Sequence, residues 1–251
     1  MTLAISYIIC SVQRSGTHLL SSVLRSTGVA GRPAEYLVCK RTETWEQKWK
    51  SPSRTAYIER VWRQGATPNG VFGLVMMWTY FERAIRMLRE IPAYQHLSLE
   101  QVLPTVFRQP KYIWLRRRDR LQQAVSWAIA SQTKVWSQKR GEGPQPDAAP
   151  RFDFESIDER YNHITDDEQN WADYFRKNKL EPFVLFYEDV TASHRATAER
   201  VLEFLDVQFP PGLELPAPAV EKQASPMSQE WAARYLELKE KRHGATTTKH
   251  E

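Results

Sequence analysis

Residues 4–20 read AISYIICSVQRSGTHLL, and this stretch decides the fold. Its first part, residues 4–10, is a short apolar run rich in β-branched and aromatic side chains, which is typical of a buried strand. A turn-like segment that contains Gly16 follows. From Thr17 to Ser26 apolar residues recur at helical spacing, which predicts a helix. The chain therefore begins with a buried strand that leads through a short glycine loop into a helix.

Strands and helices continue to alternate along the chain. Further strands are expected at residues 71–77, 111–115 and 183–187. Further helices are expected at residues 79–90, 121–132, 157–175 and 196–205. This alternation predicts a parallel sheet with helices on both faces, in which ligands bind beyond the carboxyl ends of the strands. The expected fold class is therefore α/β, with a single domain over residues 1–243 and a disordered tail at 244–251.

The composition narrows the classes of protein. The chain has 251 residues, 41% of them hydrophobic, and a formal net charge of +5. This length suits one large domain, and the mild positive excess suits binding of a polyanionic small molecule or, weakly, of nucleic acid. The two cysteines, Cys10 and Cys39, are too far apart in sequence to indicate a disulfide framework or a metal site. Because no apolar run is long enough to span a membrane, we expect a soluble, cytoplasmic protein.

The loop from Arg14 to Thr17 is the first candidate binding site. The first N–H groups of a helix have no partners within it, and together with the helix dipole they attract anions. Gly16 lets the backbone approach an anion, Ser15 and Thr17 add hydroxyl donors, and Arg14 adds a charge-assisted hydrogen bond. The alternative is an ordinary turn in which a hydroxyl caps the helix. The sequence contains no Gly-Lys pair, which argues against a nucleoside-triphosphate P-loop.

A second candidate site follows the strand at 111–115. This strand runs directly into Arg116, Arg117 and Arg118, and Ser126 lies about two turns along the next helix. Guanidinium groups bind phosphate through paired hydrogen bonds. The alternative is a solvated basic run. Because both candidate loops follow the carboxyl ends of strands, together they suggest a nucleotide that carries phosphates at both ends.

The two motifs together resemble those of the PAPS-dependent sulfotransferases, with the strongest likeness to the bacterial trehalose 2-sulfotransferase-like family. The likeness extends in patches from about residue 7 to about residue 235. The patches lie at residues 13–17, 27–36, 67–73, 123–126, 134–136 and 169–171. The order and spacing of these patches make a chance match improbable. The resemblance implies a P-loop-like sulfotransferase fold.

The resemblance also implies how the donor would bind. The donor would be PAPS (3′-phosphoadenosine-5′-phosphosulfate), and the reaction would need no metal. The loop from Arg14 to Thr17 would hold the 5′-phosphosulfate end, and Arg117 and Ser126 would hold the 3′-phosphate. Tyr187, in the segment Tyr187-Glu188-Asp189, would lie near the adenine.

Two further residues are candidate contacts of the nucleotide, His18 from its position and Lys222 from the resemblance. His18 lies on the first turn of the helix after the loop, and Lys222 matches a late residue of the family; the alternative for each is a solvent-exposed position. Segments 32–66 and 133–170 are expected to be insertions that shape the acceptor site or a lid. The resemblance also suggests a homodimer.

The chemistry that the resemblance implies needs a base, because the acceptor loses a proton as it attacks sulfur. Glu35, in Pro33-Ala34-Glu35-Tyr36, matches the glutamate of the family and is the candidate base, and Arg14 is the candidate for stabilising charge during in-line transfer. Trp78 and Trp45 are candidate substrate contacts, since aromatic rings stack on sugars and flat acceptors. Val75 stands where the trehalose-type enzymes have a lysine, which argues against trehalose as the acceptor.

The sequence thus predicts transfer of a sulfuryl group to a hydroxyl, or less readily to an amine or guanidine nitrogen, of a small polar metabolite. A small-molecule kinase on a similar sheet is the first alternative, and the missing Gly-Lys pair argues against it. A non-catalytic module that binds nucleic acid or another polyanion is the second. We expect neither nucleic acid nor a membrane among the partners.

Overall fold

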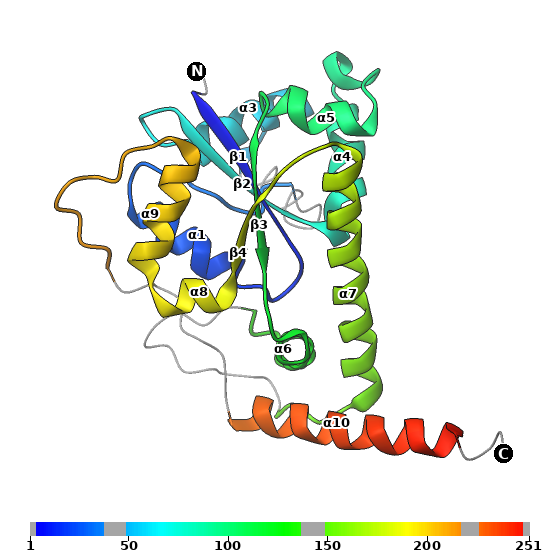
Figure 1. Cartoon of the computed structure of the whole chain (residues 1–251). Helices are drawn as coiled ribbons and strands as arrows, with labels where there is room; N and C mark the ends of the chain where they lie inside the picture. Colours follow the sequence, from blue (N-terminus) through cyan, green and yellow to red (C-terminus); the bar gives the residue numbers. More distant parts are fainter. Residues whose placement is uncertain (1–3, 38–48, 137–148, 217–225, 248–251) are drawn as a thin grey trace.

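The computed structural model describes residues 4–37, 49–136, 149–216 and 226–247. Its centre is a four-stranded parallel sheet in the order β2-β1-β3-β4 (Figure 1). The strands are β1 (Ile5–Ser11), β2 (Val71–Met77), β3 (Lys111–Arg116) and β4 (Phe183–Phe186). Each agrees with a strand predicted from its apolar run to within a residue at either end. The α/β fold with a parallel sheet is therefore confirmed.

Helices lie between and after these strands, and they are found on both faces of the sheet (Figure 1). They are α1 (Thr17–Ser26), α3 (Arg54–Gly65), the 3-10 turn η1 (Trp78–Tyr80), α4 (Phe81–Arg89), the 3-10 turn η2 (Pro92–Tyr94), α5 (Leu99–Val106), α6 (Arg120–Thr133), α7 (Phe154–Lys177), α8 (Tyr187–Ala192), α9 (His194–Leu205) and α10 (Pro226–Thr247). Within the described ranges no helix is long and apolar enough to cross a lipid bilayer.

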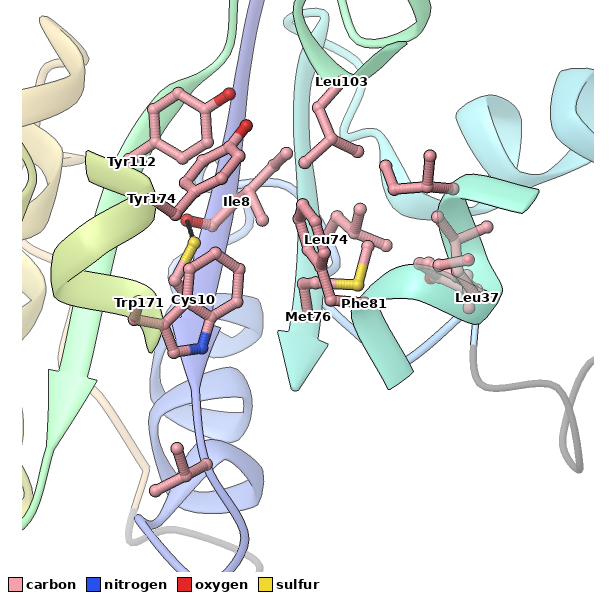
Figure 2. Close-up of a cluster of buried hydrophobic side chains, with 14 of the residues drawn as sticks. Ile8, Cys10, Leu37, Leu74, Met76, Phe81, Leu103, Tyr112, Trp171 and Tyr174 are labelled. Carbon is pink, nitrogen blue, oxygen red and sulfur yellow. Dashed lines mark hydrogen bonds between the residues drawn. The ribbon is translucent and has the colours of Figure 1, made fainter. Parts of the chain in front are cut away.

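Side chains of β1 alternate between two hydrophobic cores, as expected for a strand that is buried on both faces. Ile8 and Cys10 belong to the larger core, whereas Tyr7 and Ile9 belong to the smaller one. Figure 2 shows part of the larger core, where residues of β1 and β2 face α4 and the aromatic side chains of α7. The indole of Trp171 in α7 also donates a hydrogen bond of 2.9 Å to the carbonyl of Ser11, so α7 is fastened at the carboxyl end of β1.

The structure shows regular elements inside three segments that the sequence set apart. Within 133–170, the part from Phe154 onward forms most of α7, whose residues Ile157 and Ile164 are fully buried in the larger core. Segment 32–66 likewise contains α3, which buries Tyr57 and Val61. Helix α10 continues to Thr247, into the segment predicted as a disordered tail, because a glycine inside a helix lowers its stability by only about 1 kcal/mol and does not have to end it.

Candidate active site

The loop between β1 and α1 adopts a conformation that needs its glycine. Gly16 has φ +89° and caps α1 with its backbone alone, since no side chain caps the first N–H groups of this helix. A Cβ at Gly16 would also overlap the ring of Tyr187, which lies directly against it. Arg14 is in the left-handed region as well, with φ +64°. The N–H groups at the start of α1 therefore have no side-chain cap, as the anion site predicted from the sequence requires.

Two side chains of α6, Gln123 and Ser126, form hydrogen bonds with this loop. The role of Gln123 was not predicted from the sequence. Gln123 is fully buried, and its Nε2 donates to the carbonyl of Gln13 at 2.6 Å and to the hydroxyl of Ser15 at 3.0 Å. The hydroxyl of Ser15 in turn donates to the carbonyl of Val12 at 2.8 Å, so it points into the loop and not toward a ligand. The neighbouring Thr17 is buried on the first turn of α1. A buried glutamine inside a predicted helix gives no local signal of such a role.

Arg14 connects the loop to the second motif. Its Nε donates to the hydroxyl of Ser126 at 3.1 Å, and its Nη1 donates to the carbonyl of Trp136. Burial, together with the positive charge of nearby Arg117, lowers the pKa of Arg14 to about 10. This lowering means that the surroundings disfavour the charged form, so a bound anion would relieve the electrostatic cost.

Arg117 is the second guanidinium of the site. It lies 4.9 Å above the ring of Tyr187, and its Nε is buried without a hydrogen-bond partner among the residues that the structure describes. Burial lowers the pKa of Arg117, and the same cause raises the pKa of Tyr187. Tyr187 therefore touches both motifs, since its ring also lies against Gly16. A buried donor that no protein group satisfies calls for a ligand or water.

The other arginines of the second motif are engaged by carboxylates. Arg116 and Arg120 both donate to Glu168, with shortest distances of 2.9 and 2.7 Å, and Glu168 is only 3% exposed. Arg118 pairs with Asp189 at 2.9 Å, and its backbone N–H donates to Glu188 at 3.1 Å. The run that looked uniform in sequence therefore separates into arginines that hold the turn and one, Arg117, that faces the site.

Glu35 approaches the first turn of α1 from the edge of β2. The carbonyl of Ala34 accepts a hydrogen bond of 3.0 Å from the N–H of Val75, which places the segment alongside the strand. The Glu35 carboxylate then lies 3.6 Å from Nε2 of His18, with its side chain 11% exposed. Val75 itself is buried in the smaller core, so its side chain brings neither charge nor a hydrogen-bonding group to this region.

The structure describes Trp78, one of the two tryptophans predicted to contact the substrate, and its ring packs mainly against other aromatic side chains. The ring of Trp78 stacks on Phe81 at 4.8 Å and meets Trp171 edge-on at 5.0 Å, so it is largely committed to the aromatic core. Trp45 and Lys222 lie outside the described residues. Over the described ranges, no cluster of three or more His, Cys, Asp and Glu residues is placed to hold a metal.

A polar trio beyond the end of β2 was also missed in the sequence. The hydroxyl of Thr79 donates to Asp167 at 2.7 Å, and Nε2 of His163 lies 3.1 Å from that hydroxyl and 3.3 Å from the carboxylate. Thr79 has already given its only hydrogen to Asp167, so Nε2 of His163 must carry the hydrogen in this arrangement. Burial raises the pKa of Asp167.

Comparisons with known proteins identify the family of this chain. Residues 6–237 match the model of the Stf0 sulphotransferase family. Trehalose 2-sulfotransferase from Mycolicibacterium smegmatis (strain ATCC 700084 / mc(2)155) is 30% identical over 92% of this chain and 94% of that protein. Its counterpart from Mycobacterium tuberculosis (strain ATCC 35801 / TMC 107 / Erdman) is 28% identical over 91% of this chain and 93% of that protein.

Among solved structures, a sulfotransferase domain from the curacin biosynthetic pathway shares 17% identity, with a TM-score of 0.48, over 84% of this chain and 77% of that one. The decisive finding is the family match, which covers nearly the whole chain. The chain belongs to the Stf0 sulphotransferase family.

Proposed function

We propose that this protein transfers the sulfuryl group of PAPS to a hydroxyl of a small polar metabolite. The observation that carries the proposal is the buried guanidinium of Arg117, whose Nε has no partner among the described residues and which shares the ring of Tyr187 with the loop around Gly16. A nucleotide with phosphates on both sides of its ribose would satisfy both motifs at once. A nucleotide phosphorylated only at its 5′ end would satisfy one.

The residues present fit such a donor. The uncapped N–H groups at the start of α1, together with Arg14, would hold the 5′ end. Arg117 and Ser126 would hold the 3′-phosphate, and Tyr187 would lie beside the adenine. The lowered pKa values of Arg14 and Arg117 support this assignment, because both reflect positive charge that burial disfavours and an anion would stabilise.

Two residues, Glu35 and Arg14, would then have separate roles in the reaction. When bound, PAPS supplies the sulfuryl group and a phosphate as leaving group. Glu35 would accept the proton of the acceptor hydroxyl as its oxygen forms the bond to sulfur. Arg14 would stabilise the negative charge that develops on the leaving phosphate. Fixed positive charges and backbone N–H groups of this kind account for much of the catalysis in comparable group transfers.

The acceptor should differ from that of the trehalose-type relatives. The lysine of those enzymes is replaced by Val75, whose side chain is buried in the smaller core. Val75 therefore brings no charge to the acceptor site, where the lysine of those enzymes would. We therefore propose a hydroxyl acceptor without identifying it with trehalose, and an amine or guanidine as the less favoured class.

Calorimetric binding of 3′-phosphoadenosine-5′-phosphate (PAP), with ATP and AMP as comparisons, tests the proposal. PAP should bind much more tightly than either, because only PAP offers a 3′-phosphate to Arg117. A preference for ATP would instead favour a small-molecule kinase. Equal binding of all three, or binding of none, would contradict the proposed donor.

A further inference from the structure

The buried carboxylate of Glu168 contacts the two arginines that border the turn between β3 and α6. Arg116 is the last residue of β3 and Arg120 the first residue of α6, and Glu168 accepts hydrogen bonds from both. The turn between them carries Arg117. A single carboxylate thus spans the strand and the helix on either side of the proposed 3′-phosphate contact.

Glu168 is itself firmly placed relative to the sheet. It lies on α7 three residues before Trp171, on the same side of that helix, and the Trp171 indole is hydrogen-bonded to the end of β1 at 2.9 Å. The Arg116 guanidinium is in turn stacked 4.4 Å over the ring of Trp114. Helix α7 therefore connects the end of β1, through Trp171, with the β3–α6 turn, through Glu168.

The same contact orients the helix that braces the first loop. Helix α6 begins at Arg120 and carries Gln123, which bonds Gln13 and Ser15, and Ser126, which bonds Arg14. A shift of the first turn of α6 would therefore displace residues of both candidate anion-binding motifs.

Charge alone predicts the opposite role for Glu168. A carboxylate close to the binding site of a polyanion repels the ligand, so its removal should strengthen binding if repulsion were its only effect. Its burial and its hydrogen bonds to both borders of the turn instead indicate that it keeps Arg117 in place.

Resting on the proposed function, we infer that Glu168 is a positioning residue for the 3′-phosphate: by joining Arg116 to Arg120 it holds the turn on which Arg117 is presented. The inference predicts that removal of a negative charge beside a polyanion site weakens the binding of the polyanion. Neither the family match nor the sequence motifs assign this role.

Calorimetry on the full chain with PAP and AMP tests the inference. Glu168→Gln keeps the shape of the side chain and removes its charge. It should lower the affinity for PAP about tenfold, an effect of the size of one charge-assisted hydrogen bond. The affinity for AMP should stay near that of the wild type. Asp158→Asn is the matched control. It removes the carboxylate charge by which the same helix contacts Lys239 and Tyr235 on α10, and it should leave the ratio of PAP to AMP affinity unchanged.

Arg120→Lys provides a second route if Glu168→Gln does not fold. It preserves the positive charge but replaces the two donors that reach Glu168 with one ammonium group, and it should reduce the PAP preference by a smaller factor. Tighter PAP binding by Glu168→Gln, or an unchanged ratio in the folded variants, would overturn the inference. Absence of any PAP preference in the wild-type protein would instead reject the proposed donor.

Discussion

The two candidate anion-binding loops of this protein are built in different ways. The loop after β1 relies on backbone N–H groups, a glycine and neutral hydrogen bonds from Gln123 to Gln13 and Ser15. The turn after β3 relies on arginines, and carboxylates from two other helices, α7 and α8, engage all but Arg117 of those in the run at 116–118. The difference teaches that arginines adjacent in sequence can have different partners: within the described residues, carboxylates engage Arg116 and Arg118, whereas Arg117 keeps a buried Nε without a partner.

In our proposal the base, Glu35, lies outside both loops. Its substitution should therefore change kcat without changing the affinity for the nucleotide. Glu35→Gln should reduce kcat by about 10²–10⁴-fold, the usual contribution of a positioned base, while PAP affinity stays nearly unchanged because both loops remain intact. Single-turnover assays with labelled PAPS, alongside PAP calorimetry, measure the two effects. Sustained turnover would remove Glu35 from the role of base.

The turn after β3 should carry the largest share of nucleotide selectivity. Arg117→Ala should weaken PAP by about 10–100-fold, as expected for the loss of charge-assisted hydrogen bonds, and should change AMP binding much less. Competition binding of the two nucleotides gives the ratio directly. Equal losses for PAP and AMP would place Arg117 away from the 3′-phosphate.

The loop after β1 should be destabilised when its hydrogen bonds with Gln123 are removed. Gln123→Ala removes buried hydrogen bonds to Gln13 and Ser15 and leaves their oxygens without that donor, which should lower the free energy of unfolding by about 1–3 kcal/mol. Urea unfolding measures the loss, and PAP calorimetry should show weaker binding of both PAP and AMP. A loss confined to PAP would show that these hydrogen bonds act mainly on the second site.

The smallest effect is expected at Arg118, which serves as the matched control for Arg117. Its side chain is half exposed and pairs with Asp189 at 2.9 Å, and such pairs contribute about 1 kcal/mol or less. Arg118→Ala should therefore leave the ratio of PAP to AMP affinity close to that of the wild type. A loss as large as that of Arg117→Ala would mean that the whole run binds phosphate without distinction.

Much of the fold could be predicted from the sequence because its strands are buried on both faces. Such strands appear as short apolar runs, and residues 71–77 were identified in full on that basis. Helix α1 was also located to the residue. Helices α3, α5, α8 and α10 were missed. The tryptophan-rich and charged stretch before residue 66 obscures the periodicity of α3, and Pro104 interrupts the pattern of α5.

The candidate site was predicted only in part. Arg14, Gly16, Arg117, Ser126 and Tyr187 are brought together as the two motifs suggested. Gln123, Glu168 and the Thr79–His163–Asp167 trio were not identified. Each acts on residues far away in the chain, so local sequence patterns contain no sign of the contact.

The sequence by itself determined the parallel α/β sheet, the glycine loop and the arginine run, because each is encoded in residues next to one another. Only the tertiary structure decided which arginines remain available to a ligand. Glu168 lies 52 residues after Arg116 and Glu188 lies 70 residues after Arg118. The pairing of a charge depends on distance in space and on burial, and the fold alone sets both.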